Sequence, residues 1–417
     1  MKNVITSLVV LASLNAGAND LTVHEWGTFT SFMGADGKIQ EGLHHEEEPL
    51  PNFVYGLNKN GNISTLGAFS GTPDCPSFPT KVPCGVLGNL SLNRGQSLPV
   101  NPLNAGITQK METPVIYFYG KPETKVNVVV DFPKGIISQY YPKATTYSPK
   151  AEDITTIGPS QFVFDVKLKP VDFVGNTPAT AFNSIWNPAR EVKANTIEVD
   201  NEHEKFIFYR GVADFPSILK VESPSGNMLK LTNLSSRAIS SAIVLNSNRE
   251  KGIVKVIGAI KSGTSLELPR AEDGVAFDKY VEQAKKVIIS ALVNQGLFKD
   301  EAKAMVNTWE KSYFHTPGPR VLFLLPQIET EKILPLTLNP APKNLVRVLV
   351  GRIEIMTKAQ EDAYLDILES QAIIFSKEQT FGRFYDPKLR RLRTRVQTSD
   401  LIPDRKSLLL ERIDALL

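Results

Sequence analysis

The stretch LTVHEWGTFTSFMGADG, residues Leu21–Gly37, carries the pattern on which the fold prediction depends. Its first part, 21–32, alternates loosely between apolar and polar residues, which is typical of a half-buried β-strand. The Asp-Gly pair at 36–37 favours a hairpin turn, because both residue types tolerate positive φ. We therefore predict that the chain begins its folded part with a β-strand and not with a helix.

The same stretch contains a candidate site. In a strand, neighbouring side chains point to opposite faces, so His24 and Trp26 would lie on one side and Glu25 on the other. His24 is a candidate metal ligand or general base, Glu25 a candidate catalytic acid/base, and Trp26 a candidate binding surface. Gly27 could mark a break at which the side chains converge. The alternative is structural: Trp26 is buried and His24 is hydrogen-bonded to backbone.

The chain between residues 21 and 269 shows a β pattern. Short runs rich in Val, Ile, Phe and Tyr are separated by turn residues, and no long helical pattern lies between them. This arrangement favours an antiparallel sandwich or barrel. The runs are 114–120, 125–133, 161–168, 205–211 and several between 217 and 260.

An insertion rich in Gly, Pro, Asn and Ser is predicted over about 58–109. It contains the only two cysteines, Cys75 and Cys84. In an oxidising compartment these two should form a disulfide. The alternative, half of a metal site, lacks the C-x-x-C spacing.

After about residue 270 the apolar period becomes helical. Apolar residues recur at helical spacing from Phe277 to Leu292, and Gly296 suits a C-terminal cap. A second helix is expected after Asp300, an extended strand over 320–326 and another helix over 343–356. A capping box of Thr357 and Gln360 predicts a further helix, and the basic segment from 387 onward also has a helical pattern. We predict an α+β protein with an antiparallel β-sandwich-like N-terminal part (19–269) and an α-rich C-terminal part (270–417).

The N-terminus has the pattern of a secretory signal peptide over residues 1–18. Lys2 is followed by an apolar run and by an A-x-A cleavage site at 16–18. The apolar run is too short to cross a bilayer, and no later stretch is long enough. Loss of Lys2 changes the formal charge from +3 to +2, so no strong field indicates nucleic acid as a partner. The protein is expected to be exported, periplasmic or secreted, and to have no transmembrane segment.

A second polar cluster, HHEEEPLP, begins at His44. Imidazole and carboxylate groups are ligands for divalent ions, zinc above all. His44, His45 and Glu46 are therefore candidate metal ligands with His24, if the hairpin after residue 36 brings the two segments together. The spacing matches no established metal motif, and a solvated acidic loop is the alternative.

Two further residues are candidates. Glu112 lies next to Lys110, just before an apolar strand, and is either a catalytic acid/base or a member of an ion pair. Arg210 ends another strand and is either an anion-binding group or a structural salt-bridge partner. Motifs for a nucleophile elbow, a P-loop and a dinucleotide site are absent from the sequence.

Several segments resemble, in this order, those of a family of exported bacterial proteins marked by an HEWGTFTS-like N-terminal segment. They are VHEWGTFTSF, KMETPVIYFYG, EKFIFYRG, PRVLFLLP and VRVLVGRIE. The resemblance is scattered from Val23 to about Arg391 and implies an extracytoplasmic bacterial protein. It implies no activity.

We expect one of two functions. The first is a metal-assisted hydrolase of the envelope or the extracellular space, in which a divalent ion, zinc above all, lowers the pKa of its bound water. The second is a non-catalytic envelope module that binds a glycan or a protein through its β-rich part. A hydrolase predicts that the histidines and carboxylates meet in one pocket, whereas a binding module predicts that they are separated.

Overall fold

The computed structural model describes residues 20–43, 50–57, 63–65, 106–150, 154, 156–226, 228–260, 264–267, 269, 271–370 and 377–417. The predicted signal peptide, the candidate ligands His44, His45 and Glu46, and the predicted disulfide of Cys75 and Cys84 lie outside these ranges. The described residues form an α+β fold that is rich in strands in its N-terminal part and rich in helices in its C-terminal part.

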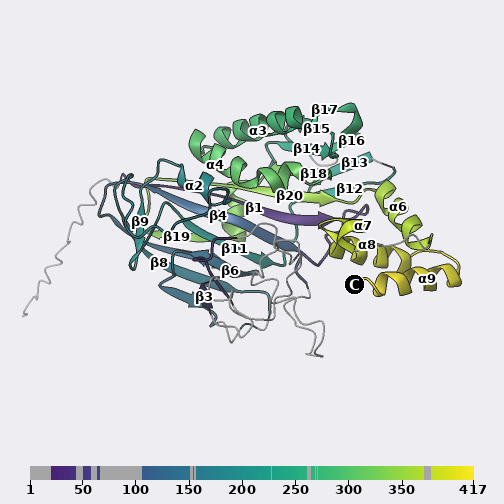
Figure 1. Ribbon diagram of the computed structural model, residues 1–417, viewed down its shortest axis with the longest axis horizontal. Coiled ribbons are helices and arrows are strands. Elements are labelled where there is room, and N and C mark those ends of the chain that lie inside the picture. Colours follow the sequence, from purple (N-terminus) through teal and green to yellow (C-terminus); the bar gives the residue numbers. More distant parts are fainter. Residues whose placement is uncertain are drawn as a thin grey trace, which may run out of the picture.

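The largest element is a mixed sheet that has β1 near its centre (Figure 1). Most neighbouring strands pair antiparallel, whereas β1 and β20 pair in parallel. Among the described residues its strands are, in spatial order, β17 (Val275–Ala276), β15 (Lys251–Ile257), β14 (Ala242–Ser247), β18 (Gly318–Leu324), β20 (Asn344–Ile355), β1 (Thr22–Met33), β4 (Gln109–Tyr119), β11 (Ile207–Ala213), β6 (Gly135–Tyr141), β2 (Tyr55–Leu57) and β3 (Ile63–Thr65).

The helix predicted over 343–356 is wrong, because this segment is strand β20. It pairs with β1 over the full length of both strands, from Thr22 opposite Asn344 to Met33 opposite Ile355. A central strand is buried on both faces, so its sequence reads as an almost continuous apolar run with no clear period of two. The sheet therefore contains strands from both sides of residue 269, and the division of the chain at that point stays a prediction.

A second sheet packs against one face of the large sheet through a shared apolar core. In this core, Phe162 and Tyr209 from the two sheets have ring centroids 5.1 Å apart. The strands of the second sheet are, in order, β10 (Glu202–Glu204), β9 (Ile197–Val199), β8 (Ser160–Leu168), β5 (Lys125–Phe132) and β19 (Leu336–Asn339), with β7 (Thr146–Ser148) paired to β8. A smaller sheet comprises β12 (Leu219–Glu222), β13 (Met228–Asn233) and β16 (Thr264–Glu267).

Helices cover the other face of the large sheet in two groups (Figure 1). The first group is α3 (Phe277–Asn294), α4 (Lys299–Glu310) and the π-helical turn η4 (Lys311–His315). The second group, at one end of the sheet, is α6 (Lys358–Glu369), α7 (Lys377–Phe381), α8 (Tyr385–Gln397) and α9 (Pro403–Asp414). Short helices α2 (Asn187–Arg190), η3 (Ala271–Asp273) and α5 (Gln327–Ile333) join other elements.

The sequence pattern and the structure agree over the helices α3, α4, α6 and α8. The stripe predicted from 277 to 292 is the buried face of α3, and Thr357 and Gln360 form the predicted capping box of α6. Asp300 does not cap α4, which begins one residue earlier and is capped by Glu301 through the backbone of Phe298. Within the described ranges, no helix combines the length and the apolar character needed to cross a membrane.

Candidate functional site

His24 lies on β1 and is held by a side chain from the first helical group. Its Nδ1 is 2.8 Å from Oε2 of Glu301, and both side chains are almost completely buried. Glu301 is the third residue of α4, and its position there places the carboxylate over the end of β1. The contact joins two segments that are 277 residues apart in the chain.

Both carboxylate oxygens of Glu301 accept further hydrogen bonds. The backbone N–H of Phe298 donates to Oε2 over 2.6 Å, and the hydroxyl of Tyr119 donates to Oε1 over 2.7 Å. Burial, and then the nearby Glu301, raise the pKa of Tyr119. The His24 ring packs between the rings of Phe298 and Tyr119, at centroid distances of 4.5 and 5.4 Å. Through these contacts His24 joins α4 to the large sheet.

Glu25 points to the opposite face of the sheet, as the alternation predicts. Arg347 on β20 donates to its Oε2 over 2.6 Å, and both side chains are completely buried. The hydroxyl of Tyr209 also bonds Glu25, and Arg347 donates to the backbone carbonyl of Leu334. Burial, and then the charge of Glu25, raise the pKa of Tyr209. Since His24 and Glu25 lie in different layers, they do not face a common ligand.

Trp26 and Gly27 complete the opening motif. Trp26 is completely buried in the core under the first helical group, with its ring 6.3 Å from that of Tyr117. A β-bulge lies at Gly27, opposite Pro114 of β4. A Cβ at Gly27 would stand 2.9 Å from the Cα of Pro114, so only glycine fits. The residue before Pro114, Thr113, has a positive φ of 40°.

A row of buried polar side chains, here called the polar belt, crosses the helix-covered face between the two helical groups. Thr28 lies opposite Glu112, and Thr30 lies opposite both Lys110 and Arg352. Directly opposite residues share one face of a sheet. The belt comprises Thr28, Thr30, Lys110, Glu112, Arg320, Arg352 and Glu354, none of which is more than 4% exposed.

Glu112, predicted as a catalytic residue, lies in the middle of the polar belt. Its Oε1 is 3.5 Å from Nζ of Lys110, and its Oε2 is 3.8 Å from a guanidinium nitrogen of Arg352. Neither oxygen has a hydrogen-bond partner among the described residues, and the residue is 1% exposed. The carboxylate of Glu112 thus lies between two cations, at N···O distances longer than those of a hydrogen-bonded salt bridge.

The end of the polar belt is a tight group of two arginines and one carboxylate. Oε1 of Glu354 accepts from Arg320 over 2.8 Å and from Arg352 over 2.7 Å. Burial alone would raise the pKa of Glu354, but the charges of the two arginines outweigh burial and lower it. The arginines also bond the backbone carbonyls of η4, with Arg320 reaching Tyr313 O over 2.6 Å and Arg352 reaching Ser312 O over 3.0 Å. They therefore satisfy the carbonyl end of this helix.

Arg210, the other predicted binding residue, lies on the same face of the sheet, on β11 opposite Gln139 of β6. It is 3% exposed, and its guanidinium carbon lies 5.9 Å from the ring centroid of Phe208. The structure thus brings Arg210 and Glu112 to one face of the sheet, and Glu25 to the other.

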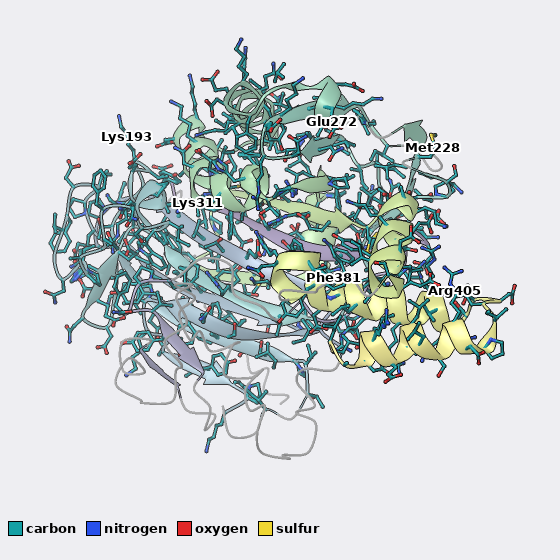
Figure 2. The ribbon with its side chains drawn as sticks, turned by 45° about the vertical axis from the view of Figure 1, so that its right-hand side comes forward. Lys193, Met228, Glu272, Lys311, Phe381 and Arg405 are labelled. Atoms are coloured by element: carbon teal, nitrogen blue, oxygen red, sulfur yellow. The ribbon has the colours of Figure 1, made fainter. Side chains whose placement is uncertain are left out.

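A cleft of about 890 Å³ opens at Glu354, where the large sheet meets the second helical group. Figure 2 shows Phe381, one of its lining residues, where α7 meets the sheet. The lining contains the cations Arg249, Arg383 and Lys388, and the carboxylate in it is that of Glu354. The other lining residues used below are His315, Thr316, Gln360, Tyr364 and Phe384.

The cations of the cleft are presented by different elements. Arg249 is exposed in the turn between β14 and β15. Arg383 donates to the hydroxyl of Thr316 over 3.3 Å and lies 5.0 Å from the ring centroid of Phe384, and burial lowers its pKa to about 9. Lys388 donates to Phe381 O over 2.7 Å. The cleft thus combines three basic side chains with a carboxylate that two arginines already balance, and this arrangement favours anions.

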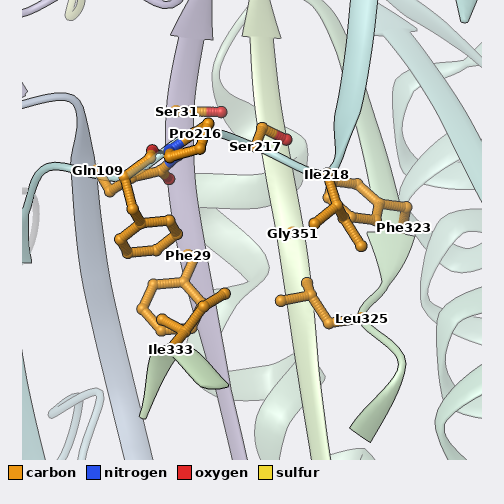
Figure 3. Close-up of a pocket in the computed structure, with 11 residues that line it drawn as sticks. Phe29, Ser31, Gln109, Pro216, Ser217, Ile218, Phe323, Leu325, Ile333 and Gly351 are labelled. Atoms are coloured by element: carbon orange, nitrogen blue, oxygen red, sulfur yellow. Dashed lines mark hydrogen bonds between the residues drawn. The ribbon is translucent and has the colours of Figure 1, made fainter. Parts of the chain in front are cut away.

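A second cavity lies on the opposite face and is not a candidate site. Figure 3 shows it between β1, β18 and β20, with Phe29, Leu325 and Ile333 around it. Its volume is about 20 Å³, which is room for about one water molecule. Its lining is mostly apolar, so it has few groups with which to hold a polar ligand.

No group of three or more potential metal ligands gathers within the described ranges. The predicted metal site therefore depends on His44, His45 and Glu46, which lie outside them. A scan against protein-family models finds no match to the chain, and a search of the curated proteins finds no matching sequence.

Sequence reasoning missed the partners of the motif residues and the cleft. Arg347, Arg352 and Glu354 belong to the segment predicted as a helix. A helix places these three residues on faces different from those of a strand, so their partners could not be inferred. Read as a strand, the segment has charged residues at 352 and 354 on one face and at 347 on the other, which would have indicated buried ion pairs. Arg383 lies just before the predicted basic helix and Lys388 lies within it, so the sequence marked part of the cleft as a basic segment, which could touch an anionic lipid or polymer or could be a solvated helix face.

Proposed function

We propose that the protein is an exported binding protein that holds an anionic ligand in the cleft between the large sheet and the second helical group. One observation carries the proposal: three cations from three separate elements line one cleft, and the carboxylate there is neutralised by buried arginines. Arg249 comes from a β-turn, Arg383 from the segment between α7 and α8, and Lys388 from α8. Cationic side chains that converge on one cleft raise the local concentration of anions.

The size and the remaining lining favour an acidic saccharide as the ligand. A volume near 890 Å³ lies in the range of small-molecule sites and exceeds the need of a single inorganic ion. Thr316, Gln360 and Tyr364 supply hydroxyl and amide groups that suit sugar hydroxyls. Phe384 supplies an apolar surface beside the guanidinium of Arg383.

We also infer that the protein is exported and that its N-terminal part is a β-sandwich. The signal-like N-terminus and the resemblance to exported bacterial proteins support a place in the envelope or outside the cell. The apolar core shared by the large sheet and the second sheet supports a β-sandwich in the N-terminal part. Both fit an envelope module that binds a glycan.

A binding screen tests the proposal. The mature protein would be titrated with an oligogalacturonate trimer and with maltotriose, a neutral trisaccharide of similar size, by isothermal titration calorimetry. We expect binding of the acidic sugar alone, and affinity that falls as salt is raised, because salt screens exposed charges. Equal binding of the two sugars, or no binding of any acidic saccharide in a panel of uronic, sulfated and phosphorylated oligosaccharides, would overturn the proposal.

A further inference from the structure

His203 is a buried histidine that packs against a surface loop. The loop, 169–186, joins β8 to α2, and His203 is the second residue of β10, opposite Glu198 of β9. His203 is 8% exposed, and the centroid of its ring lies 5.1 Å from that of Phe173 in the loop. Figure 1 shows β8, β9 and α2 at the same end of the molecule. The histidine thus joins the loop to the second sheet.

One hydrogen bond fixes which ring nitrogen carries the proton. The backbone N–H of Asn176 donates to Nδ1 of His203 over 3.1 Å. A backbone amide can only donate, so Nδ1 is the unprotonated nitrogen and the proton of the neutral ring is on Nε2. Nε2 faces the carboxylate of Glu198, with 3.7 Å between Nε2 and Oε2. The bond to the loop therefore requires a neutral imidazole.

The backbone of the loop passes close against the ring of His203. Gly175 has a positive φ of 50°, and a Cβ there would stand 2.8 Å from both Nδ1 and Cγ of His203. A protonated ring would direct a second N–H at the N–H of Asn176, and two donors cannot share a hydrogen bond. The β10–β9 ladder holds the histidine in place, so the loop is the part that yields.

The charged groups that face His203 come from β9, β8 and the start of the loop. Glu198 binds Lys169 over 2.5 Å and lies opposite Lys167 of β8. Lys167 and Lys169 also pair with Glu123, over 2.6 and 3.5 Å. Two carboxylates and two lysines therefore form one ion-pair network beside the ring.

The charged neighbours on β10 and just after it have other partners. Glu202 and Glu204 point to the other side of the strand, because side chains alternate along it, and both accept hydrogen bonds there. Lys205 donates to the carbonyl of Val171 in the loop, close to Asp172. The Nδ1 side of the imidazole thus faces the loop backbone and no charged side chain of β10.

We propose that His203 is a pH-sensitive latch on the turn 174–177 of this loop. Histidine is the side chain that ordinarily gains its proton between about pH 8 and pH 5. Above this range Nδ1 accepts from Asn176 and the turn is held. Below it the ring is a cation that donates from both nitrogens, so the bond is lost and the turn opens.

The rest of the loop is held by groups that do not titrate. The hydroxyl of Thr196 donates to Phe173 O over 2.7 Å. The side-chain amide of Asn187 donates to the carbonyls of Ala181 and Phe182, each over 2.9 Å. The opening is therefore confined to the turn, which carries the 69% exposed side chain of Val174.

Hydrogen exchange of the full chain, followed by mass spectrometry at pH 8 and at pH 5, tests the latch. The peptide that contains Asn176 reports the bond, after correction for the intrinsic pH dependence of exchange. We expect its protection factor to fall by about tenfold or more at pH 5. The peptide that contains Ser184 is the internal control. Its N–H donates to Ala181 O over 3.0 Å in the same loop, so its protection should not change.

Three variants separate the latch from other effects of pH. His203→Asn places an amide oxygen near the position of Nδ1, so Asn176 should be protected at both pH values. His203→Ala removes the acceptor, so protection should be low at both. His315→Ala, at a half-exposed histidine elsewhere, should retain the native pH dependence.

The native protein and His203→Asn decide the matter together. Equal protection of Asn176 at the two pH values in the native protein would overturn the proposal. So would a loss of protection at pH 5 in His203→Asn as large as the native loss, or full protection at pH 8 in His203→Ala.

Discussion

Nδ1 of His24 lies 2.8 Å from Oε2 of Glu301, and this contact joins the first long strand to a helix 277 residues later. Glu301 also accepts hydrogen bonds from Tyr119 and from the backbone of Phe298. Nδ1 of His24 and both carboxylate oxygens of Glu301 thus have partners inside the protein. His24 joins β1 to α4, and the ligand site that we propose lies elsewhere, at the cleft.

Replacing His24 should therefore destabilise the protein. We expect His24→Ala to lower the free energy of unfolding by about 2–3 kcal/mol, because a buried carboxylate loses one of its donors. Urea unfolding of the native protein and the variant at neutral pH measures this difference in the free energy of unfolding. His24→Gln, which keeps a side-chain N–H donor, should recover part of the loss. His315→Ala, at a half-exposed histidine, should change stability by less than about 0.5 kcal/mol. A stable His24→Ala protein would contradict this role.

Gly27 should not tolerate even one added methyl group. A Cβ there would stand 2.9 Å from the Cα of Pro114, which is backbone and cannot turn away. We expect Gly27→Ala to cost about 1–3 kcal/mol, the usual cost of an overpacked core. Gly258 has open space around its Cβ position, so Gly258→Ala is the control and should be neutral or slightly stabilising. Equal stability of the two variants would disprove the proposed steric reason.

The Glu354 carboxylate should make stability depend on pH on the acid side. The folded-state pKa of Glu354 is lowered, because the charges of Arg320 and Arg352 outweigh burial. Its contribution is therefore fully present above the unfolded-state pKa of about 4.3 and is lost as pH falls through the lower folded-state pKa. Glu354→Gln should cost about 3–5 kcal/mol at pH 7, since it leaves two buried guanidiniums without their carboxylate.

Chemical denaturation between pH 3 and pH 7 measures the free energy of unfolding of the native protein and of Glu354→Gln. The loss of stability toward low pH should be smaller in Glu354→Gln than in the native protein. Glu250→Gln, at an exposed position in a β-turn, should retain the native pH profile. An unchanged profile in Glu354→Gln would show that this group does not carry the acid dependence.

Metal content separates the two expected functions. Elemental analysis of protein prepared without chelator would compare the native chain, His24→Ala and His44→Ala/His45→Ala. We expect His24→Ala to leave any bound zinc unchanged, because the ring is buried between those of Phe298 and Tyr119. A metal lost in His24→Ala alone, with the fold intact, would return His24 to the ligand set and favour the hydrolase.

Strand β1 could be predicted because its apolar and polar residues alternate, and the structure has β1 over Thr22–Met33. The expectation that β1 is half-buried is wrong, because both of its faces are buried. The prediction failed at β20, because apolar residues follow one another along most of that strand and leave little alternation to detect. Among the local helix signals, the capping box of Thr357 and Gln360 was right and the cap at Asp300 was wrong.

The candidate site could be predicted only in part, because its chemistry depends on contacts distant in sequence. Nothing near His24 indicates Glu301, and nothing near Glu25 indicates Arg347. Strand geometry was enough to predict that His24 and Glu25 lie on opposite faces of the sheet. The residues that they contact could be identified only from the three-dimensional structure. The cleft combines Arg249, Arg383 and Lys388 from separate elements, and no single segment of sequence contains such a pattern.

The most direct test of the proposed function is a calorimetric titration of native protein and Arg249→Glu with an oligogalacturonate trimer. Arg249 is exposed, so charge reversal there should leave the fold intact. Arg237→Glu, at an exposed arginine beyond the opposite end of β14, is the control. We predict that Arg249→Glu weakens binding by roughly tenfold or more, the effect of about 1.4 kcal/mol, while Arg237→Glu binds as the native protein does. Equal affinity of all three proteins for the acidic sugar would contradict an anion site in this cleft.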